Sequence, residues 1–277
     1  MTSASSASSR PVLEPACQYD AIADVYDGYP GNYLEDVLFF VEEAKQSGSP
    51  VLEVGVGTGR LAFCLAAVGL DVVGIDTSAA MLRGLERKRG QVPKVPGRVR
   101  VLAADMRRFA LRQRFRTAIV AFRTFLYLLT ADDQRRALRA IARHLSPEGR
   151  LVMSFFVPRA ELVARGRTEP REVARFEAPD GGGDVRVRDW TEFRPAAQQV
   201  VSHITYEWPD SADAVTRRRE HTLTARYVFP EQVPPLLECC GYRVVAAYGG
   251  FDRRPLTNAS REQIWLAQPT SERASKL

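Results

Sequence analysis

The sequence predicts an α/β fold, with a doubly wound, seven-stranded Rossmann-like sheet and an antiparallel β insertion after the fifth strand. From residue 51 to residue 156, short apolar runs alternate with amphipathic segments, which is typical of a parallel sheet with right-handed crossovers. After residue 158 the apolar side chains repeat with a period of two, as antiparallel strands do. A chain of 277 residues with 45% hydrophobic content is long and apolar enough to bury one such core and an insertion.

The first half of the chain supplies the elements of a parallel sheet. Its predicted strands are short apolar runs at 51–54, 71–75, 98–102, 117–122 and 150–156. Predicted helices at 60–68, 78–89 and 132–145 carry apolar residues at helical spacing. Thr77 or Ser78 can cap the second of these helices. The third begins with an acidic pair and stops before a proline–glycine turn.

The second half predicts a lid and the end of the main sheet. Polar residues at 159–183 predict a flexible loop, and period-two alternation at 184–193, 198–208 and 216–229 predicts an antiparallel meander. A helix at 230–240 and strands at 242–248 and 263–267 would complete the sheet. The chain therefore divides into a disordered tail at 1–16, a cap and cofactor-binding core at 17–157, a substrate lid at 158–229, the end of the core at 230–268, and a tail at 269–277.

Composition argues against several functional classes. No apolar run approaches the length of a membrane span, and the N-terminus lacks the features of a signal peptide. The four cysteines form no C-x-x-C pair, which favours a reducing cytoplasm over a disulfide framework or a zinc site. The net charge is +6, but the arginines are spread along the chain rather than gathered in a stripe. We therefore expect no nucleic-acid partner.

A glycine-rich loop, Glu-Val-Gly-Val-Gly-Thr-Gly at 53–59, follows the first predicted strand and opens a helix. Closely spaced glycines let a ligand approach the backbone, and a helix N-terminus offers free N–H donors. Asp76 ends the next strand, where its carboxylate can accept both hydroxyls of a ribose. Gly57, Gly59 and Ala62 also satisfy the dinucleotide pattern, so these features alone leave NAD open.

Two acidic residues and two further observations argue against NAD. Glu53 lies inside the first strand, where dinucleotide folds usually carry apolar residues, and its carboxylate can fix the loop or meet a cationic group. Asp105 ends the third strand and can accept an adenine amine or cap the following turn. Nothing in the chain resembles a hydride-transfer acid–base pair, and the chain finishes with two strands.

Residues 53–59, Asp76, Asp105-Met106 and the stretch 121–129 resemble, in order and spacing, the successive motifs of class I S-adenosylmethionine-dependent methyltransferases. The resemblance covers residues 19–156 well and 230–267 in outline. It implies S-adenosylmethionine as cofactor. The residues that it places at the cofactor are Glu53, Gly55 and Gly57 at the methionine part, Asp76 at the ribose, Thr77, Met81, Asp105 and Met106 at the adenine, Phe122 at the amino-acid end, and Tyr19 and Tyr26 over the carboxylate. Met81 and the two tyrosines also suit simple core packing.

The region after the fourth predicted strand lacks the signatures of three methyltransferase subclasses. The chain lacks the N/D-P-P-Y/F signature of amino-methylating nucleic-acid enzymes, the acidic metal ligands of catechol-type enzymes and the paired glutamates of protein arginine methyltransferases. What remains resembles natural-product enzymes, including those that methylate amino sugars. Tyr127 would orient or deprotonate the nucleophile, and a phenol pKa near about 10 favours orientation. His203 and His221 are candidate bases because imidazole titrates near neutral pH, although both also suit a sheet surface.

The sequence thus predicts methyl transfer from S-adenosylmethionine to a small-molecule acceptor, with nitrogen favoured over a ring carbon or oxygen. No metal site, nucleic acid or membrane is expected, and the protein would act in the cytoplasm as a monomer or homodimer. An NAD-dependent oxidoreductase and a non-catalytic protein that binds adenosyl ligands are the alternatives.

Overall fold

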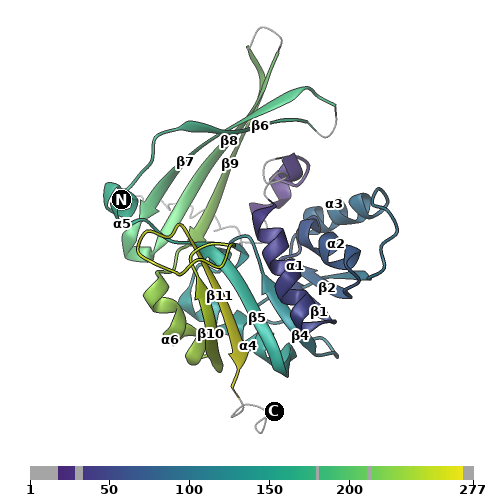
Figure 1. Cartoon of the computed structure of the whole chain (residues 1–277). Helices are drawn as coiled ribbons and strands as arrows, with labels where there is room; N and C mark the ends of the chain where they lie inside the picture. The colour runs from purple at the N-terminus through teal and green to yellow at the C-terminus, as the bar shows by residue number, and fades with distance from the viewer. Residues whose placement is uncertain (1–17, 29–33, 179–180, 211–213, 271–277) are drawn as a thin grey trace, which may run out of the picture.

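The computed structural model of the chain describes residues 18–28, 34–178, 181–210 and 214–270. Within these ranges the strands form two sheets, one of seven strands and one of four. The four-stranded sheet stands beside the α/β core as a layer of long hairpins (Figure 1). Of the tails predicted at 1–16 and 269–277, all but residues 269–270 lie outside the described residues. No helix in the described ranges is long and apolar enough to cross a lipid bilayer.

The seven-stranded sheet has the strand order β10-β11-β5-β4-β1-β2-β3. Its strands are β1 (Val51–Val54), β2 (Val72–Asp76), β3 (Val99–Ala103), β4 (Phe115–Val120), β5 (Leu145–Phe156), β10 (Tyr242–Tyr248) and β11 (Glu262–Pro269). Strands β1 to β5 pair in parallel, whereas β11 is antiparallel to both β5 and β10. The predicted fold class is confirmed, with its five parallel strands and its two-strand ending.

Helices pack their apolar stripes against both faces of this sheet. One face is covered by α1 (Glu35–Ser47), α2 (Arg60–Ala67) and α3 (Ala79–Arg89), and the other by α4 (Ala131–His144) and α6 (Val233–Glu238). Helix α1 was not predicted from the sequence, although its Val37, Phe40 and Ala44 are buried at helical spacing. With both faces covered by helices, a ligand is expected at the carboxyl ends of the strands, as in other open α/β sheets.

The four-stranded sheet is the predicted insertion after β5. Its strands, in spatial order, are β6 (Arg171–Glu177), β7 (Asp184–Arg194), β8 (Gln199–Pro209) and β9 (Val215–Arg226), and each neighbouring pair is antiparallel. The prediction of a flexible loop at 159–183 is wrong, because this segment contains α5 (Ala160–Arg165) and β6. As an edge strand, β6 carries the charged residues that such strands favour, and its sequence therefore looks polar.

The N-terminal cap, residues 18–28, connects the two sheets. It consists of two short 3-10 turns, η2 (Asp20–Ile22) and η3 (Tyr26–Gly28). Ile22 and Val25 are buried and pack with Val187 and Tyr206 of the second sheet. The other side of the cap faces the core, where its polar residues bind α3 and the glycine loop. Figure 1 shows the cap beside the ends of α2 and α3.

Candidate active site

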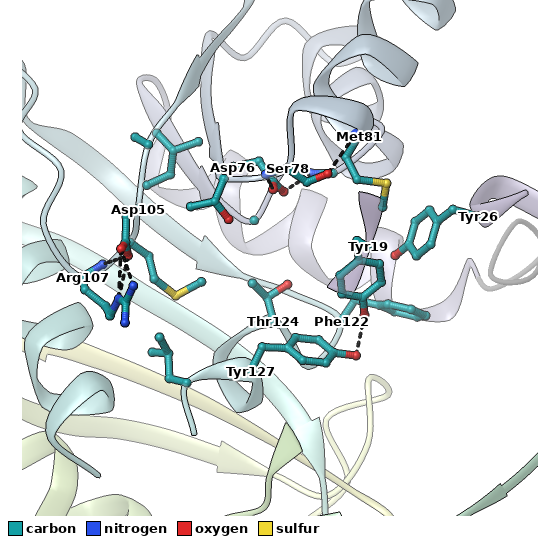
Figure 2. A pocket seen from close by; sticks show the side chains of 17 residues that line it. Tyr19, Tyr26, Asp76, Ser78, Met81, Asp105, Arg107, Phe122, Thr124 and Tyr127 are labelled. Carbon is teal, nitrogen blue, oxygen red and sulfur yellow. Dashed lines mark hydrogen bonds and ion pairs between the residues drawn. The ribbon is translucent and has the colours of Figure 1, made fainter. Parts of the chain in front are cut away.

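A cavity lies where β1, β2, β3 and β4 end, beside the N-terminal cap (Figure 2). Its lining residues are Tyr19, Tyr26, Gly55, Gly57, Ile75, Asp76, Thr77, Ser78, Met81, Ala104, Asp105, Met106, Arg107, Phe122, Thr124, Tyr127 and Leu128. Every predicted site residue is among them except Glu53, His203 and His221. The six lining residues that were not nominated from the sequence are Ile75, Ser78, Ala104, Arg107, Thr124 and Leu128. Each lies within two residues of a nominated position, so proximity in sequence was the available signal.

The glycine loop and Asp76 form one hydrogen-bonded unit. Gly55 and Gly57 adopt φ angles of +76° and +54°, which favour glycine over residues with a side chain. The Gly57 N–H donates to Asp76 Oδ2 over 2.9 Å, and the Ser78 N–H donates to Oδ1 over 2.8 Å. Burial raises the pKa of Asp76, although the N–H groups of Ser78, Gly57 and Thr77 oppose the shift. The carboxylate therefore holds the loop and still faces the cavity.

Phe122 lies in a strained turn directly after β4. Both Phe122 and Arg123 adopt left-handed φ angles, of 52° and 68°, which cost a non-glycine residue about 1–2 kcal/mol each. Strand β4 begins at Phe115 and ends at Val120, so the strand predicted at 117–122 is shifted by two residues toward the C-terminus. The turn brings Phe122 into the cavity and sets Thr124 against Gly55. Strain of this kind concentrates at functional sites.

Two aspartates anchor the cap to the core. Asp20 accepts a hydrogen bond from the Ser78 hydroxyl at the start of α3. Asp27 accepts one from the Thr58 hydroxyl over 2.6 Å and forms an ion pair with Lys88 at 2.9 Å. Neither aspartate was assigned a role from the sequence, although each follows one of the two nominated tyrosines. In each Tyr-Asp pair the tyrosine lines the cavity and the aspartate fixes the backbone that carries it.

Three tyrosines enclose one side of the cavity. The Tyr19 hydroxyl donates to the Tyr127 hydroxyl, and their rings meet edge to face with centroids 5.2 Å apart. Tyr26 lies against Tyr19 in the same way at 5.6 Å. Burial, and then the neighbouring Tyr127 phenol, raise the pKa of Tyr19 well above its usual value. Burial also raises the pKa of Tyr26 and of Tyr127. All three phenols are therefore protonated at neutral pH. Figure 2 shows the three rings together at one end of the cavity lining.

Glu53 is buried in β1 and does not line the cavity directly. Burial raises its pKa to about 8, with a lowering effect from the Arg60 charge and raising effects from Asp76 and Asp36. Its Oε2 atom has no hydrogen-bond partner among the described residues. A buried carboxyl without full hydrogen bonding is costly. This cost makes Glu53 a candidate for a role at the site.

The shifted pKa of Glu53 predicts a pH dependence of stability. Its folded pKa of about 8 exceeds the unfolded value of about 4.3. The contribution of Glu53 to the free energy of unfolding is therefore fully present below about pH 4.3 and is lost as the pH rises through about 8. Glu53→Gln removes this loss, on the order of 1 kcal/mol per pH unit. Urea unfolding of both proteins between pH 5 and pH 8 should show the variant gaining relative stability, and parallel pH curves would contradict the assignment.

The two histidines nominated as bases lie in the second sheet, away from the cavity lining. His203 stacks on Trp190 with ring centroids 3.8 Å apart. It neighbours Ile204, which packs toward the cap, so strand alternation turns His203 to the opposite face. His221 pairs with Ile204 across the strands and shares its face, but it does not reach the cavity either. Burial, and then the Arg219 charge, lower the pKa of His221, against a raising effect of the Gln18 backbone.

The cavity fits S-adenosylmethionine on the evidence of its own groups. The Asp76 and Asp105 carboxylates can accept ribose hydroxyls and an adenine amine. With a pKa of about 8 the buried Glu53 carboxyl is mostly protonated at neutral pH without a ligand, and a nearby ammonium or sulfonium charge would favour its ionised form. An anionic pyrophosphate nearby would oppose that ionisation. Glu53 thus favours a cationic ligand over a dinucleotide.

Comparison with known proteins supports the same conclusion. A protein-family model described as a methyltransferase domain matches residues 51–149. Cypemycin N-terminal methyltransferase from a Streptomyces species is 27% identical over 246 residues, covering 89% of this chain and 92% of that protein. The dTDP-4-amino-2,3,4,6-tetradeoxy-D-glucose N,N-dimethyltransferase of Saccharopolyspora spinosa is 32% identical over 201 residues, covering 62% of this chain and 76% of that protein.

A solved structure extends the likeness to the whole fold. The CcbJ methyltransferase from Streptomyces caelestis superposes with a TM-score of 0.77 at 26% identity, covering 93% of this chain and 98% of that one. The match therefore includes the second sheet as well as the core. The chain belongs to the class I S-adenosylmethionine-dependent methyltransferases, and S-adenosylmethionine is its cofactor.

Proposed function

We propose that this enzyme transfers the methyl group of S-adenosylmethionine to a nitrogen atom of a small-molecule acceptor, an intermediate of natural-product biosynthesis. The observation that carries the proposal is the set of proton acceptors in the cavity. Among the described lining residues these are Asp76, Asp105 and the three tyrosines. Asp76 is engaged by the backbone N–H groups of Gly57 and Ser78, and the phenols have raised pKa values.

This set suits an amine better than an alcohol. A neutral amine attacks through its lone pair and releases its proton to water after the N–C bond has formed. A hydroxyl group needs a base to remove its proton during attack, and a buried phenol with a raised pKa is a poor one. The printed names of two relatives, an N-terminal methyltransferase and an amino-sugar N,N-dimethyltransferase, also describe methylation at nitrogen.

The chain's own groups would bind and align the reactants. The bound cofactor supplies a methyl group on a sulfonium centre, which is already activated for displacement. Asp76, Thr77, Met81, Asp105 and Met106 would hold the nucleoside, and Glu53, Gly55, Gly57 and Phe122 would hold the methionine part. Tyr127 would orient the acceptor, because its oxygen can accept an amine N–H besides the hydrogen bond from Tyr19. Alignment and exclusion of water then account for the acceleration.

The remaining sequence-based expectations belong to the same proposal. The enzyme would act as a monomer or homodimer in the cytoplasm, without a nucleic-acid or membrane partner. The spread of the arginines along the chain supports the first exclusion, and the cysteine pattern supports a reducing compartment. His203 and His221 stay candidate bases only for an acceptor that reaches from the cavity to the second sheet, which the amine mechanism does not require.

The experiment pairs amine acceptors with their hydroxyl counterparts and follows methyl transfer by mass spectrometry. We expect N-methyl products from amino sugars or peptide N-termini and no turnover of the matching alcohols. Tyr127→Phe should lower kcat by less than about tenfold, the value of one hydrogen bond, and should leave the pH profile unchanged. Preferential O- or C-methylation would contradict the nitrogen assignment. A loss of a thousandfold or more in Tyr127→Phe with an altered pH profile would show instead that Tyr127 is a base.

A further inference from the structure

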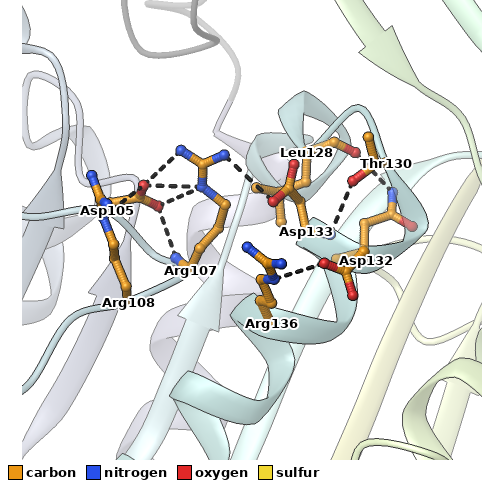
Figure 3. Close-up of polar contacts among 9 residues, drawn as sticks. Asp105, Arg107, Arg108, Leu128, Thr130, Asp132, Asp133 and Arg136 are labelled. Atoms are coloured by element: carbon orange, nitrogen blue, oxygen red, sulfur yellow. Dashed lines mark hydrogen bonds and ion pairs between the residues drawn. The ribbon is translucent and has the colours of Figure 1, made fainter.

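The carboxylate of Asp105 is held by Arg107 from two sides. The Arg107 backbone N–H donates to Oδ1 over 2.8 Å, and its side chain donates from Nε to both carboxylate oxygens and from Nη2 to Oδ2 over 2.7 Å. Arg108 adds a longer ion pair to Oδ2 at 3.7 Å. Both Asp105 and Arg107 line the cavity. Figure 3 shows the guanidinium spread along the carboxylate.

The far side of Arg107 is fixed by the start of helix α4. Its Nη1 atom lies 3.4 Å from Asp133 Oδ1, so the guanidinium spans the gap between the two carboxylates. The backbone of Asp133 is itself held, because its N–H donates to the hydroxyl of the N-cap residue Thr130 over 3.0 Å. A continuous series of contacts thus runs from the helix cap to the cavity (Figure 3).

This arrangement determines the charge and the direction of the Asp105 carboxylate. Partial burial alone would raise the pKa of Asp105, but hydrogen bonds from Arg107 and the charges of both arginines hold it below the ordinary value. An ionised carboxylate only accepts hydrogen bonds, whereas a protonated one can also donate. The planar fork of an arginine additionally fixes the orientation of the carboxylate it binds, which a lysine does not.

We infer that Arg107 is a positioning residue that makes Asp105 select a ligand base with an exocyclic amine and reject one with a carbonyl at that position. The inference rests on the proposed placement of Asp105 at the adenine amine. Adenine presents an amine, which donates to the carboxylate. Hypoxanthine presents a carbonyl oxygen there, which meets the carboxylate acceptor to acceptor. Arg107 thereby contributes to cofactor specificity without taking part in the chemistry.

The test compares the affinities of S-adenosylhomocysteine and S-inosylhomocysteine by calorimetry. We expect the wild-type enzyme to prefer the adenosyl ligand by roughly ten- to a hundredfold, the range of a hydrogen bond to a charged group. In Arg107→Gln the preference should narrow to within about threefold. The affinity of this variant for S-adenosylhomocysteine should also fall as the pH is lowered through the mildly acidic range, because the pKa of Asp105 is no longer held down. Wild-type affinity should stay level over the same range.

Arg107→Lys separates charge from orientation. Lysine retains the positive charge but lacks the planar fork of arginine. The preference for the adenosyl over the inosyl ligand should therefore narrow, while the affinity for S-adenosylhomocysteine stays independent of pH. Arg136→Gln is the matched control. Arg136 forms an exposed ion pair with Asp132 at 2.7 Å on helix α4, the helix that also carries Asp133, and it does not line the cavity. This control should keep the wild-type preference.

The possible outcomes distinguish the role of Arg107 from the placement of Asp105 at the adenine amine. A wild-type preference that survives in Arg107→Gln overturns the role of Arg107 and leaves the placement of Asp105 intact. A wild-type enzyme that binds both ligands equally overturns that placement and the inference with it. Should Arg107→Gln fail to fold by circular dichroism, Arg107→Lys decides alone, and an undiminished preference in that variant overturns the inference.

Discussion

Gly55→Ala is expected to weaken the binding of S-adenosylhomocysteine by at least about a hundredfold. At a φ of +76° an alanine is strained, and its Cβ would stand 2.2 Å from Thr124 Cγ2. The left-handed backbone costs about 1–2 kcal/mol, and the overlap must be relieved by moving either the loop or the turn that carries Phe122. Because both segments line the cavity, either movement disturbs the cofactor site. Calorimetric titration of the folded variant measures the effect.

Two further variants show which part of this loss comes from the clash. Gly69→Ala is the matched control, since Gly69 has a φ of +88° and an added Cβ there would meet no atom within 4 Å. It should lower the free energy of unfolding by about 1–2 kcal/mol and leave the affinity unchanged. Adding Thr124→Ala to Gly55→Ala should recover part of the affinity. Binding by Gly55→Ala within threefold of wild type would contradict the loop geometry.

Asp76→Ala is expected to have an effect of similar size, a loss of about a hundredfold or more in affinity for S-adenosylhomocysteine. The carboxylate accepts hydrogen bonds from Gly57 and Ser78 and is the group proposed to bind the ribose hydroxyls. A hydrogen bond to a charged group contributes about 1.5–3 kcal/mol, so losing two hydroxyl contacts accounts for the expected change. Asp76→Asn, which keeps one acceptor, should fall between wild type and Asp76→Ala in calorimetry.

Asp71→Ala provides the control at the other end of the same strand. Asp71 directly precedes β2, where its carboxylate accepts the Arg98 N–H over 3.0 Å, and it does not line the cavity. This variant should keep the wild-type affinity even if it loses some stability. Equal losses in Asp71→Ala and Asp76→Ala would mean that damage to the strand, rather than ligand contact, explains the effect.

Most residues that line the cavity could be predicted because they lie at the ends of strands. Asp76 and Asp105 each follow a short apolar run, and parallel strands bring such positions to one edge of the sheet. The glycine loop could also be predicted because its residues are consecutive in the sequence. The periodicity of the insertion predicted most of the second sheet but missed β6, where charged residues dominate.

The remaining features depend on contacts between distant segments. Asp20 and Asp27 hold the cap through Ser78 and Thr58, residues that nothing in the local sequence links to them. The left-handed turn at Phe122 contains no glycine, so the sequence does not indicate it. The register of β8 with β9 places His203 and His221 on opposite faces of the sheet, and only the packing of the cap against Ile204 shows which face is which.

We propose that the cavity beside the glycine loop binds an adenosyl ligand of the methyl-transfer type. The most direct test is calorimetric titration of the wild-type protein with S-adenosylhomocysteine and, separately, with NAD. We predict micromolar binding of the first with one site per chain, and no detectable binding of the second. Binding of NAD with an affinity equal to or greater than that of S-adenosylhomocysteine would contradict the account.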